Sequence, residues 1–183
     1  MLPQFQNLDL LVTALTHRSA LNEREASGTT AQESNERLEF LGDAVLELIT
    51  TEFLFEKFPQ DPEGMLTAYR SALVKTSTLA AAAQELKLGE KMYLSKGEEA
   101  TGGRENESLL ADTFEAVIGA LYLDQSYQAV KEFLEQHLFV KFKKIKTQRL
   151  YKDPKSLLQE TVQAQGSNTP IYQVVSETGP DHD

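Results

Sequence analysis

Residues 35–46, which read NERLEFLGDAVL, limit the fold of this chain more than any other part of it. A helix advances about 100° per residue, so Glu36, Glu39 and Asp43 would share an arc of roughly 60° on one face. The other directions are mostly apolar, at Leu38, Leu41, Val45, Leu46, Leu48 and Ile49. Such a helix is expected to lie deep in a core, which a purely solvated acidic stripe would not require. Glu47 falls on the same stripe, so spacing alone leaves a solvated face and a metal or acid–base site both open.

A second acidic helix is predicted over residues 108–124, SLLADTFEAVIGALYLD, where Asp112 and Glu115 are three apart and share a face. Each helix carries a glycine near its acids, Gly42 and Gly119. Glycine in mid-helix costs about 1 kcal/mol relative to alanine, so we expect another backbone to pack closely there. Packed together, the two helices would gather carboxylates that repel one another unless cations bind. Oxygen ligands without Cys or a nearby His favour Mg²⁺ or Mn²⁺ over zinc.

Composition limits the class of protein. With 183 residues and 40% hydrophobic content, the chain can form one full domain with a small addition. It contains no Cys, which excludes a disulfide scaffold and fits a reducing cytoplasm. Its first ten residues include polar and acidic ones and no long apolar run, so we expect neither a signal peptide nor a membrane span. The expected location is the cytoplasm.

Hydrophobic periodicity predicts an all-α fold, because strand patterns are nearly absent before Ile171. The expected helices cover residues 7–16, 35–57, 63–86 with a break near 75–78, 108–124, and 126–146. Residues 95–105, SKGEEATGGRE, are glycine-rich without the spacing of a phosphate-binding loop, so we expect a connecting loop. His17 follows the first helix, and we expect it to be a hydrogen-bonded structural group without a chemical role.

Charge is distributed unevenly along the chain, whose net charge is −10. Residues 141–155 carry +6 and the remainder carries −16, because seven basic residues there accompany one acid, Asp153. The basic residues are Lys141, Lys143, Lys144, Lys146, Arg149, Lys152 and Lys155. Such a segment could hold phosphates while divalent cations neutralise the acids elsewhere. The alternative is a solvated helix end whose lysines complement the helix dipole.

The two acidic stretches together resemble the signature pair of the bacterial-type ribonuclease III family. The pair is NERLEFLGDAVL at 35–46 and ESLLADTFEAVIGALYLD at 107–124. Four further segments fall in the family's order: LVTALTHRSA at 11–20, GMLTAYRSALV at 64–74, GGREN at 102–106 and KDPKSLLQE at 152–160. The resemblance therefore covers essentially the whole chain.

This resemblance implies a domain organisation and an activity. Residues 1–147 would be the helical nuclease domain, 148–152 a linker, and 153–183 the first part of an α+β double-stranded RNA-binding domain. Because 31 residues are fewer than the ~40 that usually fold unaided, we expect the chain to be truncated or incomplete. The family hydrolyses double-stranded RNA with Mg²⁺, leaving 5′-phosphate and 3′-hydroxyl ends with short 3′ overhangs. Processing of ribosomal RNA precursors, messenger RNA and other structured RNAs is the implied role.

The resemblance also implies residue roles. Glu39, Asp43, Asp112 and Glu115 would hold Mg²⁺, for which Mn²⁺ could substitute, and Glu36 would assist catalysis from the rim. Glu63 would be an accessory acid near the active valley, and a bound duplex would touch Lys152, Lys155 and Gln159.

A homodimer is expected around Phe40, which lies about 40° from Glu36 and 60° from Asp43 around the helix. Periodicity alone leaves this ring either exposed beside the acids or turned into its own core. In related ribonucleases the phenylalanine at this position inserts into the partner, which favours the exposed alternative.

Two alternative functions stay open at the level of sequence. An all-α nucleotide pyrophosphohydrolase also holds Mg²⁺ with ExxE carboxylates on helices, although the second pair here is DxxE. A nuclease-like domain that only binds RNA would have no need for all five acids. A di-iron bundle is disfavoured because no ExxH occurs in the chain.

Overall fold

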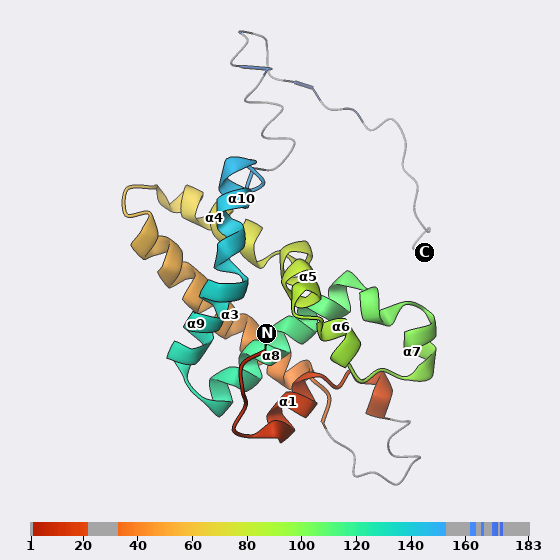
Figure 1. Ribbon diagram of the computed structural model, residues 1–183. Coiled ribbons are helices and arrows are strands. Elements are labelled where there is room, and N and C mark those ends of the chain that lie inside the picture. Colours follow the sequence, from red (N-terminus) through yellow and green to blue (C-terminus); the bar gives the residue numbers. More distant parts are fainter. Residues whose placement is uncertain are drawn as a thin grey trace. The chain divides into compact units, whose positions relative to one another are not determined.

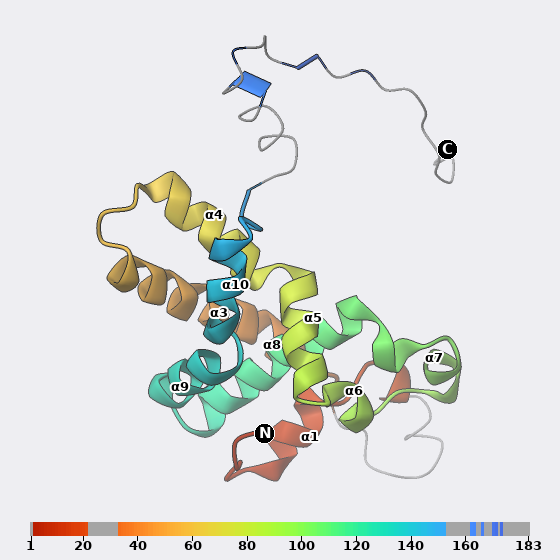
Figure 2. The ribbon, with the colours of Figure 1, turned by 45° about the horizontal axis from the view of Figure 1, so that its top comes forward.

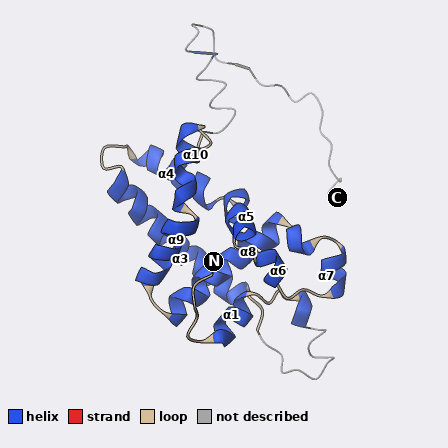
Figure 3. Ribbon diagram, in the orientation of Figure 1, coloured by secondary structure: helices blue, strands red, loops and turns tan. Residues whose placement is uncertain are grey.

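The computed structural model describes residues 2–21, 33–152, 162–163, 166, 170–171 and 173. Its helices are α1 (Leu8–Ala14), α3 (Glu36–Lys57), α4 (Glu63–Val74), α5 (Thr76–Glu85), α6 (Leu88–Lys91), α7 (Lys96–Ala100), α8 (Glu107–Asp124), α9 (Tyr127–His137) and α10 (Phe142–Thr147), with 3-10 turns η1 (Gly103–Glu105) and η2 (Phe139–Lys141) (Figure 1). Apart from one isolated bridge between Thr16 and Tyr93, these residues form no strand (Figure 3). The prediction of an all-α fold is confirmed for this part of the chain.

Helix α8 lies at the centre of the fold, between α3 and α5 in both views (Figures 1 and 2). Its residues 110–121 are almost all buried, and Phe114, Ile118 and Leu121 are fully enclosed. Helices α1, α6 and α9 also pack against it. The apolar character around most of this helix is explained by neighbours on nearly every side, which leaves few directions for polar side chains.

The two glycines beside the acids are the points at which α3 and α8 cross. A methyl group added at Gly42 would overlap the backbone carbonyl of Glu115, and one added at Gly119 would overlap the carbonyl of Leu38. The predicted close backbone approach is therefore confirmed at both positions. Because the helices touch through their backbones, side chains on the flanking turns of α3 and α8 are brought to one place.

Gly42→Ala is expected to destabilise the fold by roughly 3 kcal/mol, at the upper end of the usual cost of overpacking. The added methyl group meets backbone atoms, which cannot turn aside as a flexible side chain could. Urea unfolding followed by circular dichroism measures the change. Gly64→Ala in α4 is the matched control, since nothing lies within 4 Å of the added atom, and it should leave stability unchanged or slightly raised. Equal stability of the two variants would contradict the crossing.

Side-chain caps set where two of the helices begin. The Asn7 carboxamide oxygen accepts a hydrogen bond from the backbone N–H of Asp9 at 3.0 Å. The Asn106 oxygen accepts from Ser108 at 2.9 Å and from Leu109 at 3.2 Å. These bonds satisfy N–H groups that have no partner within the first helical turn. Both helices therefore begin within a residue of the predicted starts.

The expectation of a loop over residues 95–105 is wrong, because this stretch forms α7 and η1. The Ser95 hydroxyl caps α7 by accepting from the backbone N–H of Glu98 at 3.1 Å. The Arg104 guanidinium donates to the carbonyls of Gly89 at 2.8 Å and Met92 at 2.9 Å, and so ties η1 to α6. Local composition favoured a loop, whereas these contacts across 12–15 residues order the segment.

The expected single helix over residues 126–146 is divided into α9, η2 and α10. In an uninterrupted helix Phe139 would lie about 140° around the axis from the buried Leu134. The turn at η2 instead brings Phe139 inward, where it is 6% exposed and stacks on Phe53 with ring centroids 4.1 Å apart. Phe142 then meets Tyr69 edge to face at 5.2 Å. Aromatic packing against α3 and α4 thus outweighs helix continuity.

Contacts divide the chain into Met1–Tyr151 and Lys152–Asp183. The boundaries proposed from sequence at 147 and 152 stay a prediction, because most of residues 153–183 lies outside the described part of the chain. No helix among the described residues is long and apolar enough to cross a membrane.

Candidate active site

Four carboxylates from two helices gather beside the glycine crossing. Glu39 and Asp43 come from α3, and Asp112 and Glu115 come from α8; we call these four residues the acid cluster. Glu39, Asp112 and Glu115 are half-buried, whereas Asp43 is exposed. The negative charges of Asp112 and Asp43 both raise the pKa of Glu39, in addition to its burial. The predicted convergence of the two helices' acids is thus present in the fold.

Glu115 has the most strongly perturbed side chain of the cluster. Burial, together with the neighbouring charges of Asp43, Asp112, Glu39 and Glu47, raises its pKa from 4.5 to about 8. Burial disfavours the charged form because the carboxylate loses water, and like charges add to that cost. The carboxyl group therefore keeps its proton at neutral pH until a cation offsets the surrounding negative charge.

His17 lies close enough to the cluster to affect it. Burial raises the pKa of Asp112, and interaction with His17 opposes that shift. The Nδ1 atom of His17 accepts from the backbone N–H of Ser19 at 3.3 Å and lies 2.9 Å from the Ser19 hydroxyl oxygen. That hydroxyl oxygen accepts from the backbone N–H of Ser95 at 3.0 Å. The expected hydrogen bonds of His17 are confirmed, but its place beside Asp112 was not predicted.

The donor set of the cluster suits a divalent cation. All four ligands would be carboxylate oxygens, which is the chemistry that Mg²⁺ and Mn²⁺ prefer. Within residues 2–21 and 33–152, no three acidic or imidazole side chains are already close enough to hold an ion together. The residues therefore fit the ion by the type of their donor atoms.

Glu36 lies at the edge of the cluster and has its own partners. The Ser34 hydroxyl donates to its carboxylate at 2.8 Å, and the Arg18 guanidinium lies 3.6 Å away. The charge of Glu36 also raises the pKa of Glu39. This arrangement agrees with a position on the rim, and its role in catalysis stays a prediction.

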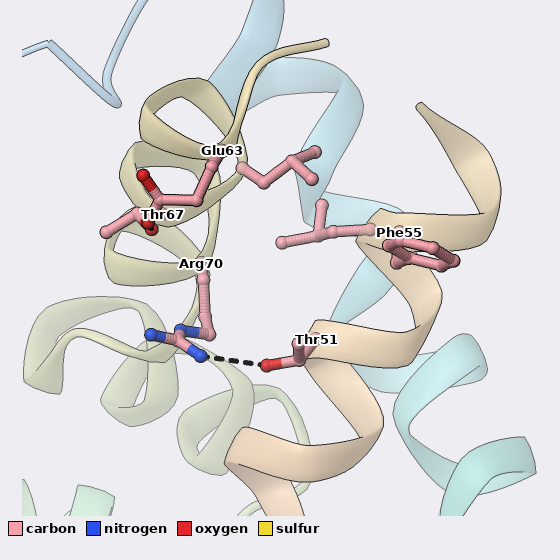
Figure 4. Close-up of a pocket in the computed structure, with 7 residues that line it drawn as sticks. Thr51, Phe55, Glu63, Thr67 and Arg70 are labelled. Carbon is pink, nitrogen blue, oxygen red and sulfur yellow. Dashed lines mark hydrogen bonds between the residues drawn. The ribbon is translucent and has the colours of Figure 1, made fainter. Parts of the chain in front are cut away.

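Two other acids, Glu47 of α3 and Glu63 of α4, have partners outside the cluster, although the charge of Glu47 still raises the pKa of Glu115. Glu47 forms an ion pair of 3.0 Å with Arg70 of α4, which also donates to the Thr51 hydroxyl at 2.9 Å (Figure 4). Glu63 accepts from Thr67 at 3.0 Å and lines a separate hollow of about 260 Å³ between α3 and α4 (Figure 4). Glu63 is not among the charges that shift the pKa of Glu39 or of Glu115. The fold of one chain thus does not bring it into the cluster.

Phe40 is 82% exposed, so the alternative in which its ring turns into its own core is wrong. The ring borders a hollow of about 640 Å³ that reaches from α3 to Leu10 of α1 and Leu123 of α8. Leu123 is itself 55% exposed. An exposed ring beside a hollow with both apolar and polar walls is typical of an interaction surface.

The predicted RNA contacts fall at the end of the described region. Lys152 is half-buried, whereas Lys155 and Gln159 lie outside the described residues. Lysines on α10 line a further hollow of about 530 Å³ with Phe58 and Phe142. Lys146 lies 4.1 Å from the centre of the Phe58 ring, so at least one of these lysines packs against an aromatic ring instead of standing free.

Three residues that line the site were not assigned to it from the sequence. His17, Arg18 and Asn35 share a hollow of about 430 Å³ with Glu36, Glu39, Leu109 and Asp112. They are brought together because the backbone N–H of Asn35 donates to the carbonyl of Thr16 at 2.9 Å. The motif THRS at 16–19 was the available signal, but periodicity could not show which groups it faces.

Without divalent cations, the stability of the protein should fall as the pH rises from the ordinary pKa of a glutamate, 4.5, to the raised pKa of Glu115, about 8. Between its ordinary pKa of 4.5 and about 8, the folded protein binds a proton at Glu115 that the unfolded chain does not. Stability falls with pH wherever the folded state binds more protons, so this contribution is lost as pH rises. In EDTA, calorimetry should show the Tm of wild type falling relative to that of Glu115→Gln across this range. Mg²⁺ should reduce the difference at pH 8, and parallel Tm curves would contradict the buried position of Glu115.

Comparison with known proteins shows extensive similarity. A family described as Ribonuclease-III-like matches residues 7–142. Ribonuclease 3 of Chloroflexus aggregans is 47% identical over 97% of this chain and 76% of its own length, and that of Geobacillus kaustophilus is 50% identical over 97% and 71%. The nuclease domain of ribonuclease III from Campylobacter jejuni is 41% identical, with a TM-score of 0.65 over 73% of this chain and 87% of that one. The study of that structure describes flexibility in a region involved in dimer formation. Dicer from Pichia stipitis is 28% identical with a TM-score of 0.57 over 100% of this chain and 79% of that one.

Proposed function

This chain belongs to the ribonuclease III family and is an endoribonuclease of double-stranded RNA, and we propose that its chemistry takes place at the acid cluster. We assign Glu39, Asp43, Asp112 and Glu115 to Mg²⁺, for which Mn²⁺ can substitute. When bound, Mg²⁺ supplies a Lewis acid that activates water and offsets negative charge at the phosphate. The proposed products carry 5′-phosphate and 3′-hydroxyl ends.

The raised pKa of Glu115 is the observation that carries this proposal. A half-buried carboxyl group near the charges of four other carboxylates, Asp43, Asp112, Glu39 and Glu47, is costly to ionise unless a cation is present. Binding of a cation would draw off the proton of Glu115 and allow all four carboxylates to stay charged. The cluster sits on two packed helices, and elements of this kind hold catalytic groups more accurately than loops do. Glu36 then acts from the rim, where Ser34 and Arg18 orient its carboxylate.

Homodimer formation is the second part of the proposal. Three large apolar side chains of α3 are between 59% and 82% exposed: Phe40, Leu48 and Phe55. Such exposure to water is unfavourable. We place the Phe40 ring of each protomer in the hollow beside Phe40 on the other, about a two-fold axis. Two acid clusters would then cut one strand each, and their offset would leave short 3′ overhangs. In such a pair Glu63, which is remote from the cluster of its own chain, is available as an accessory acid.

The basic segment is proposed to hold the duplex outside the cluster. Lys152, Lys155 and Gln159 would contact phosphates or sugars, because A-form RNA presents mainly these groups in its shallow minor groove. Residues 153–183 resemble the beginning of a double-stranded RNA-binding domain, which supports this placement. Structured RNAs such as ribosomal precursors and messenger RNA are the proposed substrates, and the cytoplasm is the proposed location.

Cleavage assays with a matched pair of substrates test the proposal. The protein should cut duplex RNA in Mg²⁺ and not in EDTA, and it should leave nucleoside triphosphates intact under both conditions. End analysis of radiolabelled products should show a phosphate on each 5′ end that cleavage creates. Hydrolysis of triphosphates without cutting of RNA would show that the protein is a pyrophosphohydrolase and not a nuclease. Duplex binding without cutting in Mg²⁺ would show that it is only an RNA-binding domain.

A further inference from the structure

Asn35 is buried, yet its side chain makes no hydrogen bond with any of the residues that the structure describes. It is 4% exposed, it precedes α3, and its carboxamide does not cap that helix. Asn7 and Asn106 hold the same position before α1 and α8, and both use their carboxamide oxygen as a cap. An uncapped, buried carboxamide is costly unless something else satisfies it.

The Asn35 carboxamide opens into the hollow beside the acid cluster. Among the described residues, the Thr50 hydroxyl oxygen is the only side-chain polar atom that has neither solvent access nor a hydrogen-bond partner. Since the Asn35 side chain has no partner either, its polar atoms must retain solvent access, and we take this access to be through the hollow that Asn35 lines. The hollow has a volume of about 430 Å³, and Glu39 and Asp112 of the cluster form part of its wall. A group that satisfies Asn35 would therefore sit directly beside the proposed reaction centre.

His17 supplies a second hydrogen-bonding group to the same hollow. The Ser19 backbone N–H donates to Nδ1, so Nδ1 acts as an acceptor and the proton of the neutral ring lies on Nε2. No hydrogen bond to Nε2 is formed within the described residues, and His17 lines the hollow. The hollow thus offers the donor and acceptor of a carboxamide and the N–H of an imidazole.

The mixed charge of the hollow limits what can enter it. Glu36, Glu39 and Asp112 would repel a phosphate that lacks a bound cation, while Arg18 disfavours a further cation. A neutral hydroxyl group avoids both penalties and can donate and accept at once, as a carboxamide can. In an RNA duplex the group of this kind next to each phosphate is the ribose 2′-hydroxyl, which DNA lacks.

We propose that this hollow is a subsite for the 2′-hydroxyl of a ribose flanking the scissile phosphate, with Asn35 as its hydrogen-bonding partner and His17 as a second donor. The inference rests on the proposed function, because it takes the acid cluster as the place of cleavage. Asn35 would then help to distinguish RNA from DNA within the nuclease domain itself.

A set of modified duplexes tests the subsite. One duplex is all ribose, and the others carry a single 2′-deoxy nucleotide at one of the three positions on either side of the cut. For wild type, one flanking substitution should lower the cleavage rate roughly 5–10-fold, the effect of losing one hydrogen bond. Asn35→Ala should cut the all-ribose duplex more slowly by a similar factor and should not distinguish the two substrates. The subsite would be overturned if Asn35→Ala distinguished the all-ribose from the 2′-deoxy duplexes as strongly as wild type does. It would also be overturned if wild type cut every 2′-deoxy duplex as fast as the all-ribose one.

Two controls separate this result from effects on folding. Asn7→Ala removes a true cap far from the hollow, so it should lower Tm and keep full discrimination. If Asn35→Ala does not fold, Asn35→Ser keeps a residue favoured at helix starts while shortening the side chain. If wild type cuts no duplex, the proposed function fails, and equilibrium binding of the same duplexes still decides the subsite. A ribose preference in binding that Asn35→Ala lacks would support it, and an unchanged preference would reject it.

Discussion

Glu115→Gln is expected to leave the fold intact and to lower cleavage of duplex RNA by roughly 10²–10³-fold or more, the scale of removing one fixed group that stabilises developing charge. The amide keeps the volume of the side chain but cannot take the negative charge that a divalent cation needs. Single-turnover cleavage of a short duplex in saturating Mg²⁺ measures the loss. Asp43→Asn should behave similarly, since Asp43 adjoins Glu115 across the crossing of the two helices.

Stability separates this prediction from simple unfolding. Near pH 8 and above, where Glu115 ionises, the amide removes one of several like charges from the half-buried cluster, so the Tm in EDTA should rise, and at lower pH it should at least not fall. Glu107→Gln in the exposed first turn of α8 is the matched control, and it should cut RNA at the wild-type rate. Wild-type cleavage by Glu115→Gln in Mg²⁺ would remove Glu115 from the active site.

Phe40→Ala is expected to weaken the homodimer roughly 10²–10⁴-fold in Kd, since two rings are lost and each contributes about 1.5–3 kcal/mol when buried. The ring is 82% exposed in the single chain, so its removal should not reduce the stability of the fold itself. Sedimentation equilibrium over a range of protein concentrations measures the change. Cutting of both strands of a duplex should decline together with the dimer.

Val140→Ala is the control for this experiment. Val140 is 60% exposed on η2, away from the hollow that Phe40 borders, so its loss should change neither sedimentation nor double-strand cutting. A wild-type protein that sediments as a monomer at tens of micromolar while cutting both strands would contradict the paired arrangement. A Phe40→Ala dimer of unchanged Kd would place the interface elsewhere.

Local sequence determined the helices and the pairing of the acids. The starts of α1, α3 and α8 followed from periodicity, which is decided by residues within one or two turns, and side-chain caps support the starts of α1 and α8. Gly42 and Gly119 marked the crossing correctly because glycine in mid-helix is unfavourable without a close neighbour. The carboxylates then had to meet, since the glycines and the acids lie on adjacent turns of the same two helices.

Only the tertiary structure decided which side chains surround those acids. Asn35, His17 and Ser95 are far apart in sequence, and their neighbours depend on backbone hydrogen bonds between segments that periodicity treats separately. The surroundings of Glu47 also depended on the tertiary structure. Glu47 lies on the same acidic stripe of α3, but its carboxylate is paired with Arg70 of α4. Helix periodicity states which residues share a face, but it carries no information about what the rest of the chain places opposite that face. The break at η2 has the same origin, because the ring that Phe139 stacks on belongs to α3.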